Sequence, residues 1–315
     1  MRAVKAVDGA VRLVEHDEPV ADDQCLIVRV AEAGICGSDL HMVANGMAPV
    51  VMGHEFGGHL ADGTLVAVRP TGECGHCDPC TRGFQNACRE SWGTAYGIAA
   101  DGGLADAVRV EPQRVFAMLP GSRPVDAALV ESLAVSLHGV RRINPPKGSR
   151  ALVVGAGSIG LLAVAALRAE GVEVDIVSRN AHQSAAAEAL GARVVERPAS
   201  SSYLHAFDAV CTQATIDLCV KALAPGGVIA EFGMFWTPVQ LTNAMMFKEV
   251  SVVPSMGYVH TTDGDDFRDA ADTLTRVPAI ADTLVTHTFP LADAAEAFRV
   301  AADRKAGAIK VHLQP

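Results

Sequence analysis

Half of the protein's eight cysteines lie in one short, turn-rich segment. They are spaced C-x2-C-x2-C-x7-C, at Cys74, Cys77, Cys80 and Cys88. Four thiolates this close together can complete a tetrahedron around zinc and leave no coordination position open for chemistry. The alternatives are four thiols without a metal, or an iron–sulfur cluster, although the bacterial ferredoxin run has its fourth cysteine sooner and followed by proline. The spacing favours a structural zinc lobe.

A second group of metal-ligating residue types precedes this lobe. It comprises the runs Cys36-Gly37-Ser38-Asp39-Leu40-His41 and Gly53-His54-Glu55. A thiolate, an imidazole and a carboxylate together can hold zinc while one coordination position stays open for water or a substrate oxygen. Taken alone, Cys36 could also be a buried apolar thiol and His54 a core imidazole.

A glycine-rich run, Gly155-Ala156-Gly157-Ser158-Ile159-Gly160, follows the apolar stretch Ala151–Val154 and opens the helical pattern Ile159–Glu170. This is the context that the G-x-G-x-x-G dinucleotide signature requires, because the glycines allow a tight turn and bring a pyrophosphate close to the helix N-terminus. A glycine-rich turn in some other α/β protein is the alternative. The residues expected to bind the cofactor are Gly155, Gly157, Ser158, Ile159 and Gly160.

The end of the next strand bears on the choice between NADP and NAD. An acidic residue there accepts both ribose hydroxyls of NAD, whereas this strand ends in Ser178 and Arg179. A serine removes the repulsion toward a 2′-phosphate, and the guanidinium of Arg179 offers donors that match phosphate oxygens. We therefore expect NADP. The alternative is NAD, with Asp175 binding the ribose.

The hydrophobic pattern divides the chain into regions of different secondary structure. Up to about residue 120 short alternating runs separated by Gly and Pro predict antiparallel β structure. The segment Asp126–Asn144 has apolar residues at helical spacing and predicts a bridging helix. After it, apolar runs alternate with helical patterns up to Phe232, which predicts βαβ units and a parallel sheet. The end of the chain predicts a helix at Leu291–Ala301 and a strand at Ala308–Leu313.

Length and charge exclude several classes of protein. With 315 residues and a mass of 32.8 kDa, the chain predicts two domains or one large α/β unit. A formal net charge of −10 repels nucleic acid and anionic membrane surfaces, so we expect neither partner. The apolar stretch Ala151–Leu167 is too short and glycine-rich for a membrane span. Because Asp8 precedes any apolar run, we expect no signal peptide and a cytoplasmic protein, in which cysteines are metal ligands or free thiols.

Taken in order, these motifs resemble those of the zinc-containing medium-chain alcohol dehydrogenases. The resemblance rests on Cys36–His41, Gly53–Gly58, the four-cysteine lobe and Gly155–Gly160. The segment Glu131–His138 is similar to the bridging helix of the polyol (sorbitol) and threonine dehydrogenase branch, and the closing run Phe289–Val311 also looks like this family. The resemblance spans nearly the whole chain.

The family resemblance implies an α/β fold with two domains. A GroES-like, mostly antiparallel β catalytic domain would be formed by residues 1–131 and 258–315. A Rossmann domain with a doubly wound parallel sheet would be formed by residues 132–257.

The resemblance also implies site residues and two zinc ions per chain, one catalytic and one structural. The ligands implied for the catalytic ion are Cys36, His54, Glu55 and Glu131, with the two glutamates binding directly or through water. Ser38 would bond the substrate oxygen, and His41 would continue a proton path through the nicotinamide ribose to solvent. The sequence departs from the family in a short stretch between His41 and His54, a shortened hairpin after Gly58, and Ser132 in place of the usual proline.

We expect an NADP-dependent oxidoreductase acting on a primary or secondary alcohol and its carbonyl partner. The loop Met42–Met52 favours an apolar substrate, whereas Glu131 favours a polyol or an amino-alcohol. The rival hypothesis is a non-catalytic, NADPH-binding zinc protein that acts as a redox sensor or assembly partner. Relatives often form homodimers or homotetramers.

Overall fold

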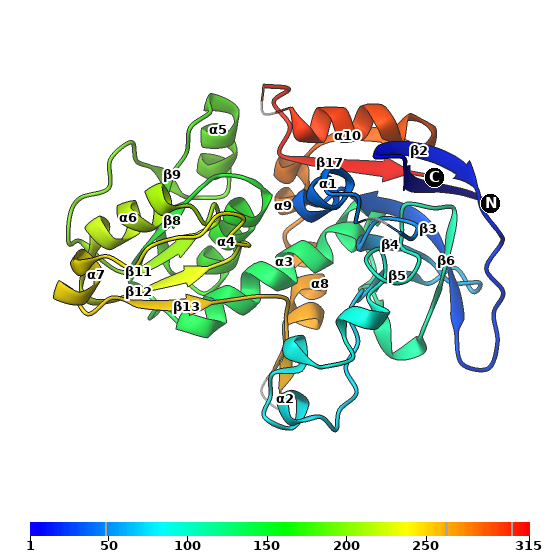
Figure 1. Ribbon diagram of the computed structural model, residues 1–315, viewed down its shortest axis with the longest axis horizontal. Helices are drawn as coiled ribbons and strands as arrows, with labels where there is room; N and C mark the ends of the chain where they lie inside the picture. Colours follow the sequence, from blue (N-terminus) through cyan, green and yellow to red (C-terminus); the bar gives the residue numbers. More distant parts are fainter. Residues whose placement is uncertain (48, 262–263, 304) are drawn as a thin grey trace. The chain divides into compact units, whose positions relative to one another are not determined.

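A computed structural model of the protein describes residues 1–47, 49–261, 264–303 and 305–315. Ala48 of the loop Met42–Met52 and Arg304 of the closing run lie outside these residues. The described chain forms two compact units: one consists of Met1–Glu131 and Val259–Pro315, the other of Ser132–Tyr258. Both ends of the chain belong to the first unit, and the second is inserted between them (Figure 1).

The first unit is built on a seven-stranded sheet in the order β16-β17-β3-β4-β5-β7, with β6 also pairing with β3. All its strand pairs are antiparallel except β16 with β17. The strands are β3 Leu26–Gly34, β4 Glu55–His59, β5 Leu65–Val68, β6 Ala107–Val110, β7 Val115–Ala117, β16 Val285–Pro290 and β17 Lys310–Gln314. Two smaller pairs are the hairpins β1 Arg2–Val7 with β2 Ala10–Glu15 and β14 His260–Thr261 with β15 Gly264–Asp265.

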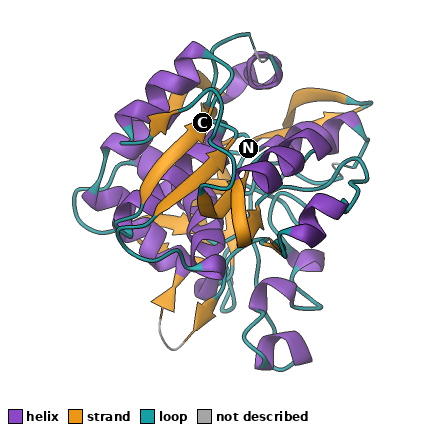
Figure 2. Ribbon diagram, turned by 90° about the vertical axis from the view of Figure 1, so that its left-hand side faces the viewer, coloured by secondary structure: helices purple, strands orange, loops and turns teal. Residues whose placement is uncertain are grey.

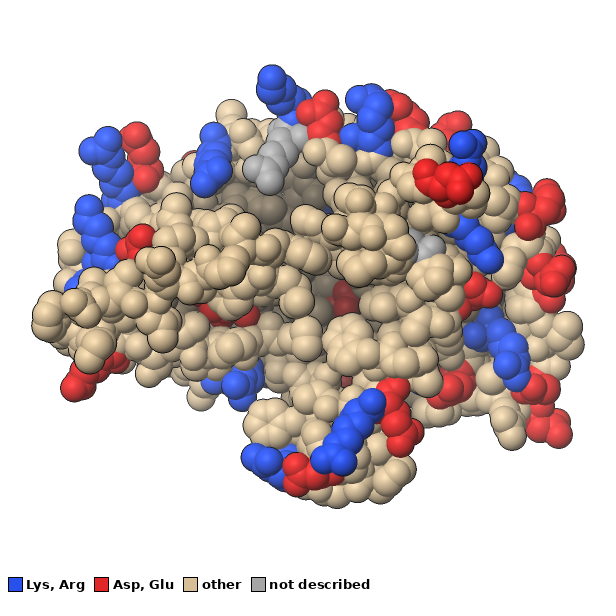
Figure 3. All heavy atoms as spheres, in the orientation of Figure 1, with Lys and Arg blue, Asp and Glu red and all other residues tan. Residues whose placement is uncertain are grey.

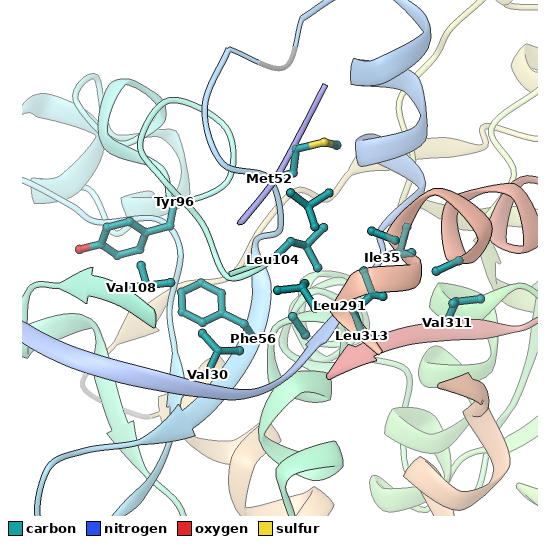
Figure 4. Packing of buried hydrophobic residues seen from close by; sticks show 14 of the residues in the cluster. Val30, Ile35, Met52, Phe56, Tyr96, Leu104, Val108, Leu291, Val311 and Leu313 are labelled. Carbon is teal, nitrogen blue, oxygen red and sulfur yellow. The ribbon is translucent and has the colours of Figure 1, made fainter. Parts of the chain in front are cut away.

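Apolar side chains from distant parts of the chain fill the core of this unit. Figure 4 shows Val30, Phe56, Leu104 and Leu313 packed together. The Phe56 ring meets the Tyr96 ring edge-on, with centroids 6.5 Å apart. Since Leu313 comes from the end of the chain and Val30 from its beginning, this core joins the two chain ends into one domain.

The helices of the first unit are short. They are α1 Gly37–Ala44, α2 Asp78–Thr81, α8 Asp266–Arg276, α9 Ala279–Leu284 and α10 Ala294–Ala302, with 3₁₀ turns at Gln85–Ala87, Trp92–Thr94, Pro112–Arg114 and Leu291–Asp293. The helix α3 Pro124–Ile143 runs from the first unit into the second. Its start is fixed by Asp126, whose carboxylate accepts the backbone N–H of Arg123 at 2.8 Å.

The second unit contains a six-stranded parallel sheet in the order β10-β9-β8-β11-β12-β13. The strands are β8 Arg150–Val154, β9 Glu173–Val177, β10 Arg193–Val194, β11 Tyr203–Asp208, β12 Leu223–Glu231 and β13 Ser251–Pro254. Four helices belong to the same unit: α4 Ser158–Ala169, α5 Ala181–Ala189, α6 Gln213–Ala222 and α7 Asn243–Phe247 (Figure 1). Figure 2 shows helices beside the strands. Numbered along the chain, the order is 3-2-1-4-5-6, which is that of a dinucleotide-binding Rossmann sheet.

The α/β fold class expected from the sequence is confirmed, and the differences lie at the ends of elements. The helix predicted from Leu291 begins with the 3₁₀ turn Leu291–Asp293, and the α-helical part starts at Ala294. The predicted strand Ala308–Leu313 is Lys310–Gln314. Local patterns place elements well but not their first and last residues, because the ends depend on capping and tertiary contacts.

Charged side chains of both signs are mixed on the surface. On the face shown in Figure 3, Lys and Arg side chains lie beside Asp and Glu side chains. Among the described residues, none of the helices has the length and apolar character needed to cross a bilayer.

Candidate active site and metal centres

The first candidate centre begins where β3 ends. Cys36 is the N-cap residue of α1, and its backbone N–H donates to Asp39 Oδ2 at 2.9 Å. Asp39 is fully buried, and its other oxygen, Oδ1, lies 3.3 Å from His54 Nδ1. One carboxylate therefore fixes both the start of the helix that carries Cys36 and the orientation of the His54 ring.

The donor atoms of three predicted ligands converge here. One ligand atom each from Cys36, His54 and Glu55 lies within 4.8 Å of the others. His54 directly precedes β4, and Glu55 begins this strand opposite Gly34 of β3. The Ser38 hydroxyl lies 3.3 Å from His54 Nε2, so the residue expected to bond the substrate oxygen reaches the same centre. His41 lies one helical turn farther along α1 and is exposed.

A buried lysine balances the negative charge of this centre. Lys310 forms an ion pair with Glu55, and both side chains are almost completely buried. Burial raises the pKa of Glu131 to about 7, with Glu55 adding to the rise and His54 and Lys310 opposing it. Burial lowers the pKa of His54, but Asp39 and Cys36 outweigh this effect and raise it well above its ordinary value. One lysine thus faces a thiol and several carboxylates, and this excess of anionic donors fits a divalent cation.

The four cysteines of the lobe also converge. Ligand atoms of Cys74, Cys77, Cys80 and Cys88 all lie within 4.8 Å of one another. Backbone N–H groups donate to their sulfur atoms, among them that of Cys74 to Cys88 Sγ at 3.3 Å and that of Cys77 to Cys74 Sγ at 3.3 Å. Backbone hydrogen bonds from Arg89 and Cys80 lower the pKa of Cys77 to about 6, whereas burial raises that of Cys80 to about 12. This thiol set fits one zinc ion with no further coordination position.

The glycine loop of the second unit has the geometry of a phosphate site. Gly155 has φ +99°, a conformation that favours glycine, and a Cβ on Gly160 would collide with the Gly155 carbonyl oxygen. Gly157 is exposed and is the N-cap residue of α4, where no side chain of the described residues caps the helix. The first N–H groups of α4 are therefore placed to bind a pyrophosphate.

Asp175 is held by contacts inside the second unit. Arg193 Nη2 donates to its carboxylate at 2.6 Å and the Tyr203 hydroxyl at 2.7 Å. Burial raises the pKa of Asp175, but these two hydrogen bonds and the Arg193 charge outweigh this effect and lower the pKa below its ordinary value. Ser178 and Arg179 follow the end of β9; Ser178 is half-buried and Arg179 is exposed.

Sequence reasoning missed two residues that shape the candidate active site. Lys310 lies in the closing run, 255 residues after Glu55, and nothing in its local sequence indicates a buried ion pair. Asp39 lies within the quoted motif, but nothing in the motif says that its carboxylate is buried against His54. Both roles depend on tertiary contacts.

Comparisons with known proteins agree with this architecture. The chain matches the family models for the alcohol dehydrogenase GroES-like domain over residues 22–120 and for the glucose dehydrogenase C-terminus over residues 131–314. The protein belongs to the zinc-containing medium-chain alcohol dehydrogenases, a family of oxidoreductases. Its fold is that of this family, a GroES-like domain with an inserted Rossmann domain.

Named relatives are dehydrogenases. The chain is 29% identical to L-galactonate-5-dehydrogenase of Escherichia coli over 90% of both chains, and 29% identical to galactitol 1-phosphate 5-dehydrogenase of the same species over 94% of both. The crystal structure of E. coli galactitol-1-phosphate dehydrogenase is similar with a TM-score of 0.89 at 26% identity, over 100% of both chains. A zinc-binding dehydrogenase of Sinorhizobium meliloti bound to NADP has a TM-score of 0.87 at 28% identity, over 100% of this chain and 99% of that one.

Proposed function

We propose that the protein is a zinc-dependent dehydrogenase that transfers a hydride between a polyhydroxylated alcohol, or its carbonyl partner, and NADP(H). The observation that carries this proposal is the convergence of Cys36, His54 and Glu55 beside the Ser38 hydroxyl. The names of the two E. coli relatives, which act on galactonate and on galactitol 1-phosphate, support a polyol or sugar-acid substrate oxidised at a secondary carbon.

Cys36, His54 and Glu55 would hold the catalytic zinc, and Glu131 would complete the set directly or through water. Zinc bound there supplies Lewis acidity, which makes a substrate hydroxyl more acidic and polarises a carbonyl. Asp39 keeps the His54 ring in place through Nδ1, so that its Nε2 faces the centre. The ion pair with Lys310 holds the Glu55 carboxylate in place.

The chain provides its own route for the proton. The Ser38 hydroxyl would accept the proton that leaves the substrate hydroxyl while it releases its own proton toward His41, because a hydroxyl can donate and accept at once. His41 follows at i+3 on the same helix and is exposed to solvent. Ser38 and His41 thus connect the centre with bulk water, and the same residues return the proton when a carbonyl is reduced.

A direct test is to incubate the purified protein with NADP⁺ and a panel of polyols, sugar acids and amino-alcohols and to follow NADPH absorbance. We expect turnover with at least one polyhydroxylated substrate. A protein that contains both zinc ions and binds NADPH but turns over none of the panel, in either direction, would contradict the proposal and favour the sensor or assembly role.

The choice of NADP rests on Ser178 and Arg179, and on the hydrogen bonds that Asp175 already accepts from other side chains. Since Arg193 and Tyr203 already bind the Asp175 carboxylate, this residue is poorly placed to accept a ribose hydroxyl. We expect the Arg179→Ala variant to raise KM for NADP⁺ about tenfold, which corresponds to about 1.4 kcal/mol, and to leave KM for NAD⁺ nearly unchanged. A wild-type protein that prefers NAD⁺ would overturn this assignment.

A further inference from the structure

A third group of metal-ligating side chains lies in the second unit, and none of its members belongs to the sequence motifs discussed above. Asp208 is the last residue of β11, Glu231 is the last residue of β12, and Cys211 lies in the turn after β11. The two strands are parallel, and Asp208 is paired in register with Glu231. One ligand atom from each of the three residues lies within 4.8 Å of the others. Exposure is 0% for Asp208, 2% for Cys211 and 1% for Glu231.

The backbone directs the Asp208 and Cys211 side chains into this group. Asp208 Oδ1 accepts the N–H groups of Val210 at 2.8 Å and Cys211 at 3.0 Å, which closes a tight turn. Cys211 has φ +59°, a left-handed conformation that is strained for a residue with a side chain. The Gly233 N–H donates to Cys211 Sγ at 3.0 Å. Burial and the nearby Glu231 and Asp208 carboxylates raise the pKa of Cys211, and this hydrogen bond opposes the rise, so the thiol loses its proton when a cation binds.

The remaining carboxylate oxygens lack hydrogen bonds. In the part of the chain that the structure describes, Asp208 Oδ2 and both oxygens of Glu231 make no hydrogen bond of normal geometry. Leaving such atoms buried without partners destabilises the folded protein. Burial raises the pKa of Glu231 to about 7; the Asp208 charge adds to this effect, and the Cys211 thiol opposes it. If all three groups are ionised, their negative charges repel one another unless a proton or a cation lies between them.

We propose that Asp208, Cys211 and Glu231 bind one Zn²⁺ or a similar thiophilic divalent cation. Zinc bonds of about 2.3 Å to sulfur and 2.0–2.2 Å to oxygen place tetrahedral ligand atoms roughly 3.3–3.7 Å apart, so the ligand atoms, which lie within 4.8 Å of one another, would each have to approach by at most about 1.5 Å. A cation would bind Cys211 Sγ, Asp208 Oδ2 and one oxygen of Glu231, and water would take the fourth position. The sulfur donor selects zinc over Mg²⁺ and Ca²⁺, which prefer oxygen ligands.

The position of this site suggests its role. Asp208 is paired in the sheet with Val154, the residue before the glycine loop, and Val210 packs directly against Gly155. A cation bound to Asp208 and Cys211 would hold the turn on which Gly155 rests. It would also neutralise buried carboxylates at the strand ends where a pyrophosphate is expected to bind. This makes it a structural site that supports the cofactor loop.

The test uses the whole 315-residue chain and does not depend on its activity. The probe is Zn²⁺ added to the purified protein, followed by removal of weakly bound ions and measurement of zinc per chain. We expect about three zinc ions in the wild type and about two in Cys211→Ser and Glu231→Gln, because each variant removes a ligand. A matched control is Cys219→Ser, which alters another buried thiol of the same domain and should retain about three.

Cadmium provides a second measurement for variants that fold poorly. We expect wild-type protein whose other two centres hold zinc to take up one further Cd²⁺, with new thiolate-to-cadmium absorption in the ultraviolet. Uptake of no third ion by the wild type, or equal zinc content in wild type and both variants, would overturn the proposal. The three side chains would then form a neutral cluster that shares protons. Dehydrogenase activity with only two zinc ions would support the proposed function while rejecting this site.

Discussion

The two cysteine-containing centres of the first domain are assembled in opposite ways. The lobe takes all its thiols from one segment of fifteen residues, Cys74–Cys88, and backbone N–H groups of that segment bind the sulfur atoms. The candidate active site draws Cys36 and His54 from separate elements. It also needs Asp39 and Lys310 to orient and balance the donors. A closed site can be encoded locally, whereas an open one depends on the fold to hold its ligands.

The largest expected difference between the centres is in catalysis. Replacing Cys36 with Ala should remove the catalytic zinc and lower kcat/KM at least about a thousandfold, roughly 4 kcal/mol in activation free energy. Thermal unfolding should change little, because Cys36 is half-buried and the core does not depend on it. Steady-state kinetics and zinc content check this. If the variant kept its activity with one zinc ion fewer, the centre at Cys36 would not be the catalytic one.

Lys310→Met should reveal the buried charge that distinguishes the active site from the lobe. Removing the lysine takes away the positive charge that pairs with the buried Glu55 carboxylate, which should lower the free energy of unfolding by about 3–5 kcal/mol when zinc is absent. Denaturant unfolding of the chelated protein measures this value. The double variant Lys310→Met with Glu55→Gln should recover most of the loss. If it recovered none, the ion pair would not be the cause.

Loss of a lobe ligand should affect stability more than chemistry. Cys88→Ala leaves three thiols for the structural zinc, so we expect zinc content to fall by about one ion and the free energy of unfolding by roughly 2–3 kcal/mol. Turnover of the protein that stays folded should fall less than tenfold. The control is Cys25→Ala, a half-buried thiol outside both centres. A thousandfold loss of kcat in folded Cys88→Ala would contradict the division of roles.

The smallest effect is expected at His76. Cys74, His76 and Glu90 also place ligand atoms within 4.8 Å of one another, so the histidine could replace a cysteine ligand. Its ring is mostly exposed and bonds the Cys74 carbonyl oxygen through Nδ1 at 2.8 Å. We expect His76→Ala to keep full zinc content and to shift stability by no more than about 0.5 kcal/mol. Loss of zinc in this variant would make the lobe a mixed thiol–imidazole site.

Sequence reasoning predicted the parts of the molecule that local spacing determines. The α/β fold, the strand-turn-helix around Gly155 and the crowding of four cysteines all follow from patterns within short segments. The helical pattern that begins at Asp126 contains both Glu131 and Ser132. In the structure, the first unit ends at Glu131 and the second begins at Ser132.

The electrostatics of the site could not be predicted in the same way. From the sequence alone, Lys310 in β17 would be expected at the solvent-exposed edge of a sheet. The fold instead buries it beside Glu55. The same holds for His312, whose Nδ1 lies 2.6 Å from buried Glu32 of β3. Asp208 and Glu231 likewise lie in ordinary apolar strand patterns, and only the parallel register brings them together. Each pairing joins residues far apart in the chain, so periodicity within one segment contains no information about it.

Asp39 has a further consequence for handling the protein. Its carboxylate orders the first turn of α1 and the ring of His54 through contacts that involve protein atoms alone. We therefore expect the ligand geometry to survive demetallation, and an emptied centre should accept cobalt under native conditions without refolding. Spectroscopically active substitutes can then report on substrate binding in an otherwise unaltered molecule.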